Sequence, residues 1–138
     1  MIGKGPSVVG IEKVVSSIAL GTAWYSQRED EICRTLLDEF VSDGGTIIDT
    51  ARNYGESEEV IGSWLSESGA RDDIAILTQG GLSQTDSTRL AEEDLGEKVK
   101  QDISTSLDRL RTDYIDLFFL HRDTITIPVE EIIDCLNE

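Results

Sequence analysis

The sequence has few of the residues that build metal centres, disulfides and nucleic-acid surfaces. It contains one histidine and two cysteines, Cys33 and Cys135, each within a helical pattern of apolar residues. We therefore expect reduced thiols, with no disulfide and no metal site. Its 12 Lys and Arg residues stand against 28 Asp and Glu, which gives a net charge of −16. This excess repels phosphate backbones and anionic headgroups, so we expect neither nucleic acid nor a membrane surface as a partner.

Long apolar runs are also missing. No stretch approaches the roughly 20 apolar residues of a membrane-spanning helix. The first residues, 1–4, do not have the apolar segment of a signal peptide. The acidic residues are spread along the expected helices, which indicates a solvated outer surface. These features predict a cytoplasmic protein, folded as a single domain over residues 1–138.

The sequence does contain a repeating alternation of short apolar strands and amphipathic helices. Ser26 and Glu29 have the spacing of a capping box at the start of the first helix, and Gly44 with Gly45 ends it. We expect strands at residues 17–21, 46–49, 74–78 and 114–120, and helices at 27–43, around 60–65 up to Gly69, at 95–110 and at 129–136. Between residues 79 and 94 the periodicity is lost, which predicts a long loop.

Strands joined by helical crossovers pair in parallel, so the chain belongs to the α/β class. Two architectures fit: an open doubly wound sheet, as in flavodoxin-like domains, and part of a (β/α)8 barrel. Open sheets bind nucleotides at a glycine-rich first turn. Residues 20–25 (LGTAWY) contain one glycine and two bulky aromatics. This favours the barrel, of which four βα units would form half.

Polar side chains follow three of the expected strands. Asp49 ends the second strand and Tyr54 lies in the turn after it, whereas Gln79 and His121 follow the third and fourth strands. Taken singly, Asp49 could be a turn cap and Tyr54 a packing residue. Because the carboxyl ends of parallel strands converge on one face, we expect these side chains to meet there. Their joint placement predicts a site for proton chemistry.

Three motifs in this order resemble the aldo-keto reductase family. They are residues 18–22 (IALGT), 48–58 (IDTARNYGESE) and 106–121 (SLDRLRTDYIDLFFLH). The resemblance runs from about Val14 to the last residue. It implies a TIM barrel that uses NADP(H) to reduce a small carbonyl substrate, an aldehyde or a ketone.

The resemblance also implies roles for individual residues. Asp49 matches the catalytic aspartate, Tyr54 the general acid and His121 the residue that orients the substrate carbonyl. A phenol is a suitable proton donor for the alkoxide that hydride addition creates, provided that its anion is stabilised. The remaining assignments are Gly21, Thr22 and Asp49 at the cofactor, Trp24, Tyr54 and His121 at the substrate, and Tyr25 beside Trp24 in an apolar pocket.

The chain departs from the family pattern at Gln79, where the family has a lysine. Glutamine can hydrogen-bond Asp49 and Tyr54 but brings no positive charge, so Asp49 would disfavour the tyrosinate. Arg52 and Arg122 are candidates for a substitute cation, although a surface position suits each equally well. We therefore expect weak carbonyl reduction or none.

The second departure is length. A (β/α)8 barrel typically needs about 250 residues, and four units leave two strand edges unpaired. In the family, most groups that bind NADP(H) come from the later strands. Three alternatives follow: a truncated N-terminal half of a reductase, a catalytically inactive binding or regulatory relative, and two copies that self-associate through the open barrel edges.

Overall fold

The computed structural model describes the whole chain except residues 84–85, 87–88, 93 and 138, so part of the expected 79–94 loop lies outside the described residues. Within the described residues, four strands alternate with four helices, which confirms the four expected βα units. The elements are β1 (Leu20–Gly21), α1 (Asp30–Ser42), β2 (Ile47–Asp49), α2 (Ser57–Ser68), β3 (Ala75–Gly80), α3 (Leu95–Leu110), β4 (Leu117–Leu120) and α4 (Val129–Asn137), with 3-10 turns at Gln27–Glu29 and Ala70–Asp72.

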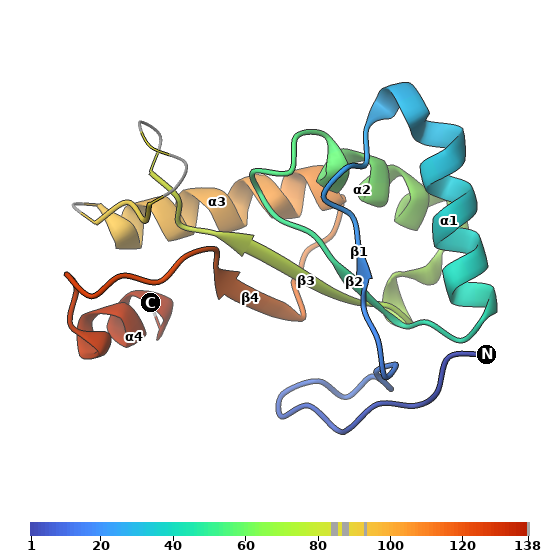
Figure 1. Ribbon diagram of the computed structural model, residues 1–138, viewed down its shortest axis with the longest axis horizontal. Helices are drawn as coiled ribbons and strands as arrows, with labels where there is room; N and C mark the ends of the chain where they lie inside the picture. The colour runs from blue at the N-terminus through green and yellow to red at the C-terminus, as the bar shows by residue number, and fades with distance from the viewer. Residues whose placement is uncertain (84–85, 87–88, 93, 138) are drawn as a thin grey trace.

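The strands form one parallel sheet in the order β1-β2-β3-β4. Figure 1 shows α1, α2 and α3 following one another along one side of this sheet. Alternate side chains divide between its faces, as the pleat requires. Ile48 and Ile76 are fully buried in a core shared with α1 and α2. Asp49 and Gln79 lie on the opposite face and are half-buried, and Phe119 on β4 is 50% exposed. The helix-covered face therefore carries the core, and the other face is open.

All four strands differ in length from the sequence prediction, the second only because it begins at Ile47 instead of Thr46. The first is shorter because Ser16 forms an antiparallel bridge with Lys4 and the N–H of Ser17 bonds the Gly3 carbonyl, so these residues pair with the lead-in segment. The fourth is shorter at its start because Asp116 takes the N–H of Ile76 with its side chain. The third is longer, because it continues to pair with β4 as far as Gly80.

The predicted capping box is wrong. Residues Gln27–Glu29 form a 3-10 turn, α1 begins only at Asp30, and the Ser26 side chain makes no capping hydrogen bond. The N–H of Gln27 is instead taken by the Glu56 carboxylate from the loop before α2. A side chain from another loop thus satisfies a donor that a local cap would otherwise serve.

Both cysteines are free thiols, Cys33 buried and Cys135 half-buried. Within the described ranges, no helix combines the length and apolar character needed to cross a membrane. The same residues contain no group of three or more potential metal ligands from His, Cys, Asp and Glu.

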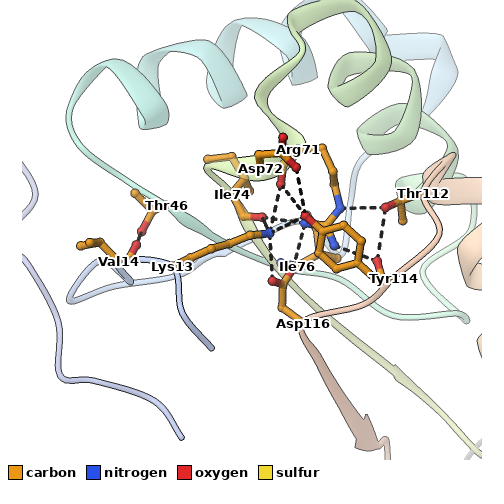
Figure 2. Close-up of polar contacts among 10 residues, drawn as sticks. All are labelled: Lys13, Val14, Thr46, Arg71, Asp72, Ile74, Ile76, Thr112, Tyr114 and Asp116. Atoms are coloured by element: carbon orange, nitrogen blue, oxygen red, sulfur yellow. Dashed lines mark hydrogen bonds and ion pairs between the residues drawn. The ribbon is translucent and has the colours of Figure 1, made fainter. Parts of the chain in front are cut away.

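A buried ionic cluster joins the lead-in segment to the starts of β3 and β4 (Figure 2). The Asp116 carboxylate lies 2.9 Å from Lys13 Nζ and 2.9 Å from Arg71 Nη1, and only 7% of its side chain is exposed. The Lys13 ammonium also donates to the Ile74 carbonyl at 2.8 Å. Arg71 stacks on the Tyr114 ring, 3.7 Å from its centroid. One carboxylate therefore holds two cations and a strand N–H together, where water screens them little.

Replacing Asp116 by Asn should lower the free energy of unfolding by about 3 kcal/mol, because two cations lose their shared counter-charge in a buried position. Urea unfolding followed by circular dichroism measures the change. The matched control is Asp113→Asn, an exposed carboxylate nearby, expected to cost less than about 0.5 kcal/mol. Equal losses in both variants would show that the cluster adds nothing beyond ordinary surface charge.

Candidate functional site

The carboxyl ends of β2, β3 and β4 bring three of the four predicted residues to one place. Asp49 is the last residue of β2, and Gln79 lies near the end of β3. The ladder continues past the strands: the N–H of Arg52 bonds the Gln79 carbonyl at 2.8 Å, and that of His121 bonds the Gly80 carbonyl at 2.9 Å. Backbone pairing, rather than side-chain contact, sets the spacing of these positions.

Gln79 occupies the centre of the site as a neutral hydrogen-bond donor. Its Nε2 atom donates to Asp49 Oδ1 at 2.9 Å. The sequence predicted that a glutamine at this position could bond both Asp49 and Tyr54, and the bond to Asp49 is present. The side-chain amide orients the carboxylate but leaves its charge uncompensated.

Tyr54 and His121 meet edge to face. Their ring centroids are 5.6 Å apart with an interplanar angle of 86°. Burial lowers the pKa of His121 from its ordinary value, the charge of Arg122 lowers it further, and Asp49 opposes both. Its Nδ1 atom is buried and has no hydrogen-bond partner among the described residues. The site therefore favours a neutral imidazole next to the phenol.

The two arginines considered as substitute cations lie differently. The Nε atom of Arg52 is 3.9 Å from Asp102 Oδ1, and Asp102 is almost fully buried. Asp102 also accepts the N–H of Gly81 at 2.9 Å. Arg52 is thus paired with another carboxylate, whereas Arg122 is exposed and acts on His121 through its charge alone.

The residues assigned to the cofactor site and the substrate pocket do not gather in one place as the residues at the strand ends do. Gly21 is exposed at the end of β1, and Thr22 is fully buried, with its hydroxyl donating to the Asp49 carbonyl at 2.9 Å. Trp24 is 91% exposed, so it lines no closed pocket within this chain. The expectation that Tyr25 lines a substrate pocket is wrong: it packs in the hydrophobic core, where burial and Cys33 raise its pKa to about 12.

A buried polar layer beneath the site escaped the sequence reasoning. Thr50, Ser57, Glu58 and Thr78 are each fully buried between the strand ends and α2. Glu58 Oε1 accepts from the Thr78 hydroxyl at 2.8 Å. Burial raises the pKa of Glu58, and the Thr78 hydrogen bond and the charge of Arg52 oppose this shift. The available signal was the Ser57-Glu58 pair in the second motif, to which no role was attached.

His121 is the only histidine, so its titration can be followed by proton NMR without assignment. We expect a midpoint below the ordinary value of 6.5. Removing the neighbouring cation in Arg122→Gln should raise the midpoint, and removing the carboxylate in Asp49→Asn should lower it further. Arg111→Gln, at the far end of α3, should leave it unchanged. A wild-type midpoint at or above 6.5 would contradict the burial of the imidazole.

Comparison with known proteins gives consistent results. The aldo/keto reductase family model matches residues 17–138. Norsolorinic acid reductase stcV of Emericella nidulans is 34% identical over 155 aligned positions, covering 96% of this chain and 40% of the relative. Aldo-keto reductase YhdN of Bacillus subtilis is 34% identical, covering 86% of this chain and 36% of the relative.

Solved structures agree with this fold. The holo form of the aldo-keto reductase AKR11C1 from Bacillus halodurans superposes with a TM-score of 0.80 at 28% identity, covering 99% of this chain and 46% of that one. An aldo/keto reductase from Klebsiella pneumoniae in complex with NADP and acetate gives 0.70 at 26% identity, covering 93% of this chain and 42% of that one. These matches confirm the expected half of a TIM barrel.

The chain spans less than half the length of these relatives. The matched part nevertheless includes all three motifs and every strand end described above. A family match from residue 17 to residue 138, with relatives at 34% identity, shows that this chain belongs to the aldo/keto reductase family.

Proposed function

We propose that this half-barrel carries the acid–base residues of an NADP(H)-dependent reductase of aldehydes or ketones, and that Gln79 makes its reaction slow. The observation that carries the proposal is the edge-to-face contact of Tyr54 with His121 beside the Asp49–Gln79 hydrogen bond. A proton donor and a polar orienting group are thus in ring contact beside the strand ends. The complex of the Klebsiella pneumoniae relative with NADP supports the choice of cofactor.

The described residues fit the cofactor in part. Gly21 and Asp49 are accessible at the strand ends and would contact it. Thr22 does not fit as a side-chain ligand, because its hydroxyl is buried and bonded to the Asp49 carbonyl. When bound, NADPH supplies the hydride for carbonyl reduction.

The chain's own residues would handle the oxygen of the substrate. Hydride addition to a carbonyl carbon leaves an alkoxide, which must receive a proton. Tyr54 would give that proton from its phenolic hydroxyl. His121, held neutral by burial, would donate a hydrogen bond from a ring nitrogen to the same oxygen and share the developing charge.

The site does little to stabilise the tyrosinate that Tyr54 becomes after it gives up its proton. A tyrosinate needs a nearby positive charge, and Gln79 provides only a dipole. Asp49 brings a negative charge, and its Gln79 partner does not neutralise it. Arg52 is directed toward Asp102. The transition state therefore lacks the preorganised cation that such chemistry uses.

A lysine at position 79 should increase kcat for aldehyde reduction by roughly 10²–10³-fold, the range typical of one preorganised charge-stabilising group. The measurement uses a complete barrel, made by joining this chain to the remaining βα units of the Bacillus subtilis relative. Gln79→Met, which removes the hydrogen bond without adding charge, is the matched control and should be no faster than the parent.

The comparison of kcat between the parent and the position-79 variants is valid only if each barrel binds the cofactor. Each complete barrel is first titrated with NADPH by nicotinamide fluorescence, and only variants that saturate are compared. A Gln79→Lys barrel that binds NADPH and is no faster than its parent would refute the explanation through charge. It would favour the second candidate, a catalytically inactive relative that keeps the scaffold for binding or regulation, which the uncharged Gln79 already supports.

The open face of the sheet supports a proposal of self-association. Phe119 on the edge strand β4 exposes 50% of its surface, and Val14 and Ile18, in the segment that leads into the other edge strand β1, expose 55% each. Two copies could pair edge to edge and complete an eight-stranded ring. With −16 on each copy, like-charge repulsion opposes this pairing and salt relieves it.

Light scattering should accordingly show a mass that rises toward twice that of the chain as NaCl is raised from about 0.05 to 0.5 M, over which screening of surface charge becomes strong. Phe119→Ser should reduce the dimer fraction. Leu36→Ser, which changes an equally exposed leucine on α1, should not. A monomer at every salt and protein concentration would exclude the paired ring.

A further inference from the structure

A chain of three buried hydroxyl groups lies directly beneath the site. Ser57 Oγ is 2.7 Å from Thr22 Oγ1 and 2.9 Å from Thr50 Oγ1. Thr22 Oγ1 in turn donates to the Asp49 carbonyl at 2.9 Å. All three side chains are fully buried. These hydrogen-bonded hydroxyls thus connect the residue after β1, the residue after β2 and the first residue of α2.

The direction of these hydrogen bonds follows from counting protons. The Asp49 carbonyl can only accept, so the single hydroxyl proton of Thr22 is used there. Ser57 must then donate to Thr22, and Thr50 must donate to Ser57. The order Thr50, Ser57, Thr22, Asp49 carbonyl is therefore fixed, and each member polarises the next. Ser57 is the middle link and has no spare proton.

The same serine holds the loop that carries Tyr54. Residues 50–56 leave β2 and return to α2, and the N–H of Ser57 donates to the Tyr54 carbonyl at 3.0 Å. Backbone bonds also hold this loop, because the N–H of Thr50 bonds the Leu77 carbonyl at 2.9 Å and that of Tyr54 bonds the Ala51 carbonyl at 3.0 Å. Among its side-chain contacts, the 3.2 Å bond from Arg109 to the Gly55 carbonyl is exposed. Exposed bonds compete with water and restrain little. The Thr50–Ser57 hydroxyl bond, by contrast, is buried and joins the two ends of the loop through side chains, where water does not weaken it.

We infer that Ser57 is a positioning residue for Tyr54: its hydroxyl links Thr50 to Thr22, fixes the Tyr54 loop against the backbone of Asp49, and so places the phenol ring against His121. This inference rests on the proposed function for its catalytic meaning. The geometric claim can be tested without any activity, because it concerns one ring contact between Tyr54 and the only histidine of the chain.

The test measures the imidazole proton resonances of His121 in the 138-residue chain. The shift that depends on Tyr54 is the difference between the wild-type chain and Tyr54→Leu. Ser57→Ala should lose at least half of that shift, because it removes the middle hydroxyl and so interrupts the series of hydrogen bonds from Thr50 to Thr22. The matched control Ser66→Ala, an exposed serine on the same helix, should keep the full shift.

Thr22 provides a second, independent test. Thr22→Val removes the hydroxyl at nearly constant shape and should lose as much of the shift as Ser57→Ala. Thr22→Ser keeps the hydroxyl and should retain the shift. Because both side chains belong to the same series of hydrogen-bonded hydroxyls, the double variant Ser57→Ala/Thr22→Val should lose no more of the Tyr54-dependent shift than either single variant.

The inference is overturned if folded Ser57→Ala keeps the shift, if Thr22→Ser loses as much of it as Thr22→Val, or if Tyr54→Leu leaves the resonances unchanged. Should Ser57→Ala fail to fold by circular dichroism, the Thr22 pair decides. Since neither NADPH nor a substrate enters the experiment, failure of the proposed reductase function would leave its outcome unaffected.

Discussion

Strand β3 is paired in parallel with β2 on one side and β4 on the other, and the position of each site residue follows from that pairing. The register sets Asp49 opposite Leu77, so the next inward-facing residue of β3, Gln79, projects beside the carboxylate. At the other edge, continuation of the ladder to the His121 N–H places the imidazole at the same level. Tyr54 is the exception, since it depends on the loop before α2 rather than on a strand.

This arrangement explains the electrostatic character of the site. Asp49 carries the negative charge, Gln79 is neutral, and burial keeps His121 neutral at physiological pH. In the proposed reaction, negative charge would move onto the substrate oxygen and then onto the phenol, so the local field would oppose both stages. A chain with a net charge of −16 adds to this field at long range, although salt screens that contribution. On the proposed function, the uncharged residue is confined to position 79, while the geometry of the described residues around it would suit the chemistry.

The sequence predicted the four βα units and the meeting of Asp49, Gln79 and His121, because strand ends in a parallel sheet converge whatever the side chains do. It failed where side chains from distant segments replace local interactions. Ser26 does not cap the first helix, because the Glu56 carboxylate from another loop accepts the N–H of Gln27. Strand β4 begins later than expected, because the Asp116 side chain accepts the N–H of Ile76. The hydroxyl chain through Ser57 was equally invisible, since Thr22, Thr50 and Ser57 are separated in sequence and each is typical of a turn.

The charge at position 79 and the open face of the sheet are not independent limits on activity. Two unit charges 4 Å apart interact by about 1 kcal/mol in bulk water and by about 4 kcal/mol in a partly excluded protein environment. The face that carries Asp49 and Gln79 is open in this chain, and Phe119 beside it is half exposed. Water would weaken the interaction of a cation added here with a tyrosinate, so the stabilisation of the tyrosinate would be small. For the proposed reaction, this face would first have to be covered, because the charge at position 79 could set the rate only after water is excluded.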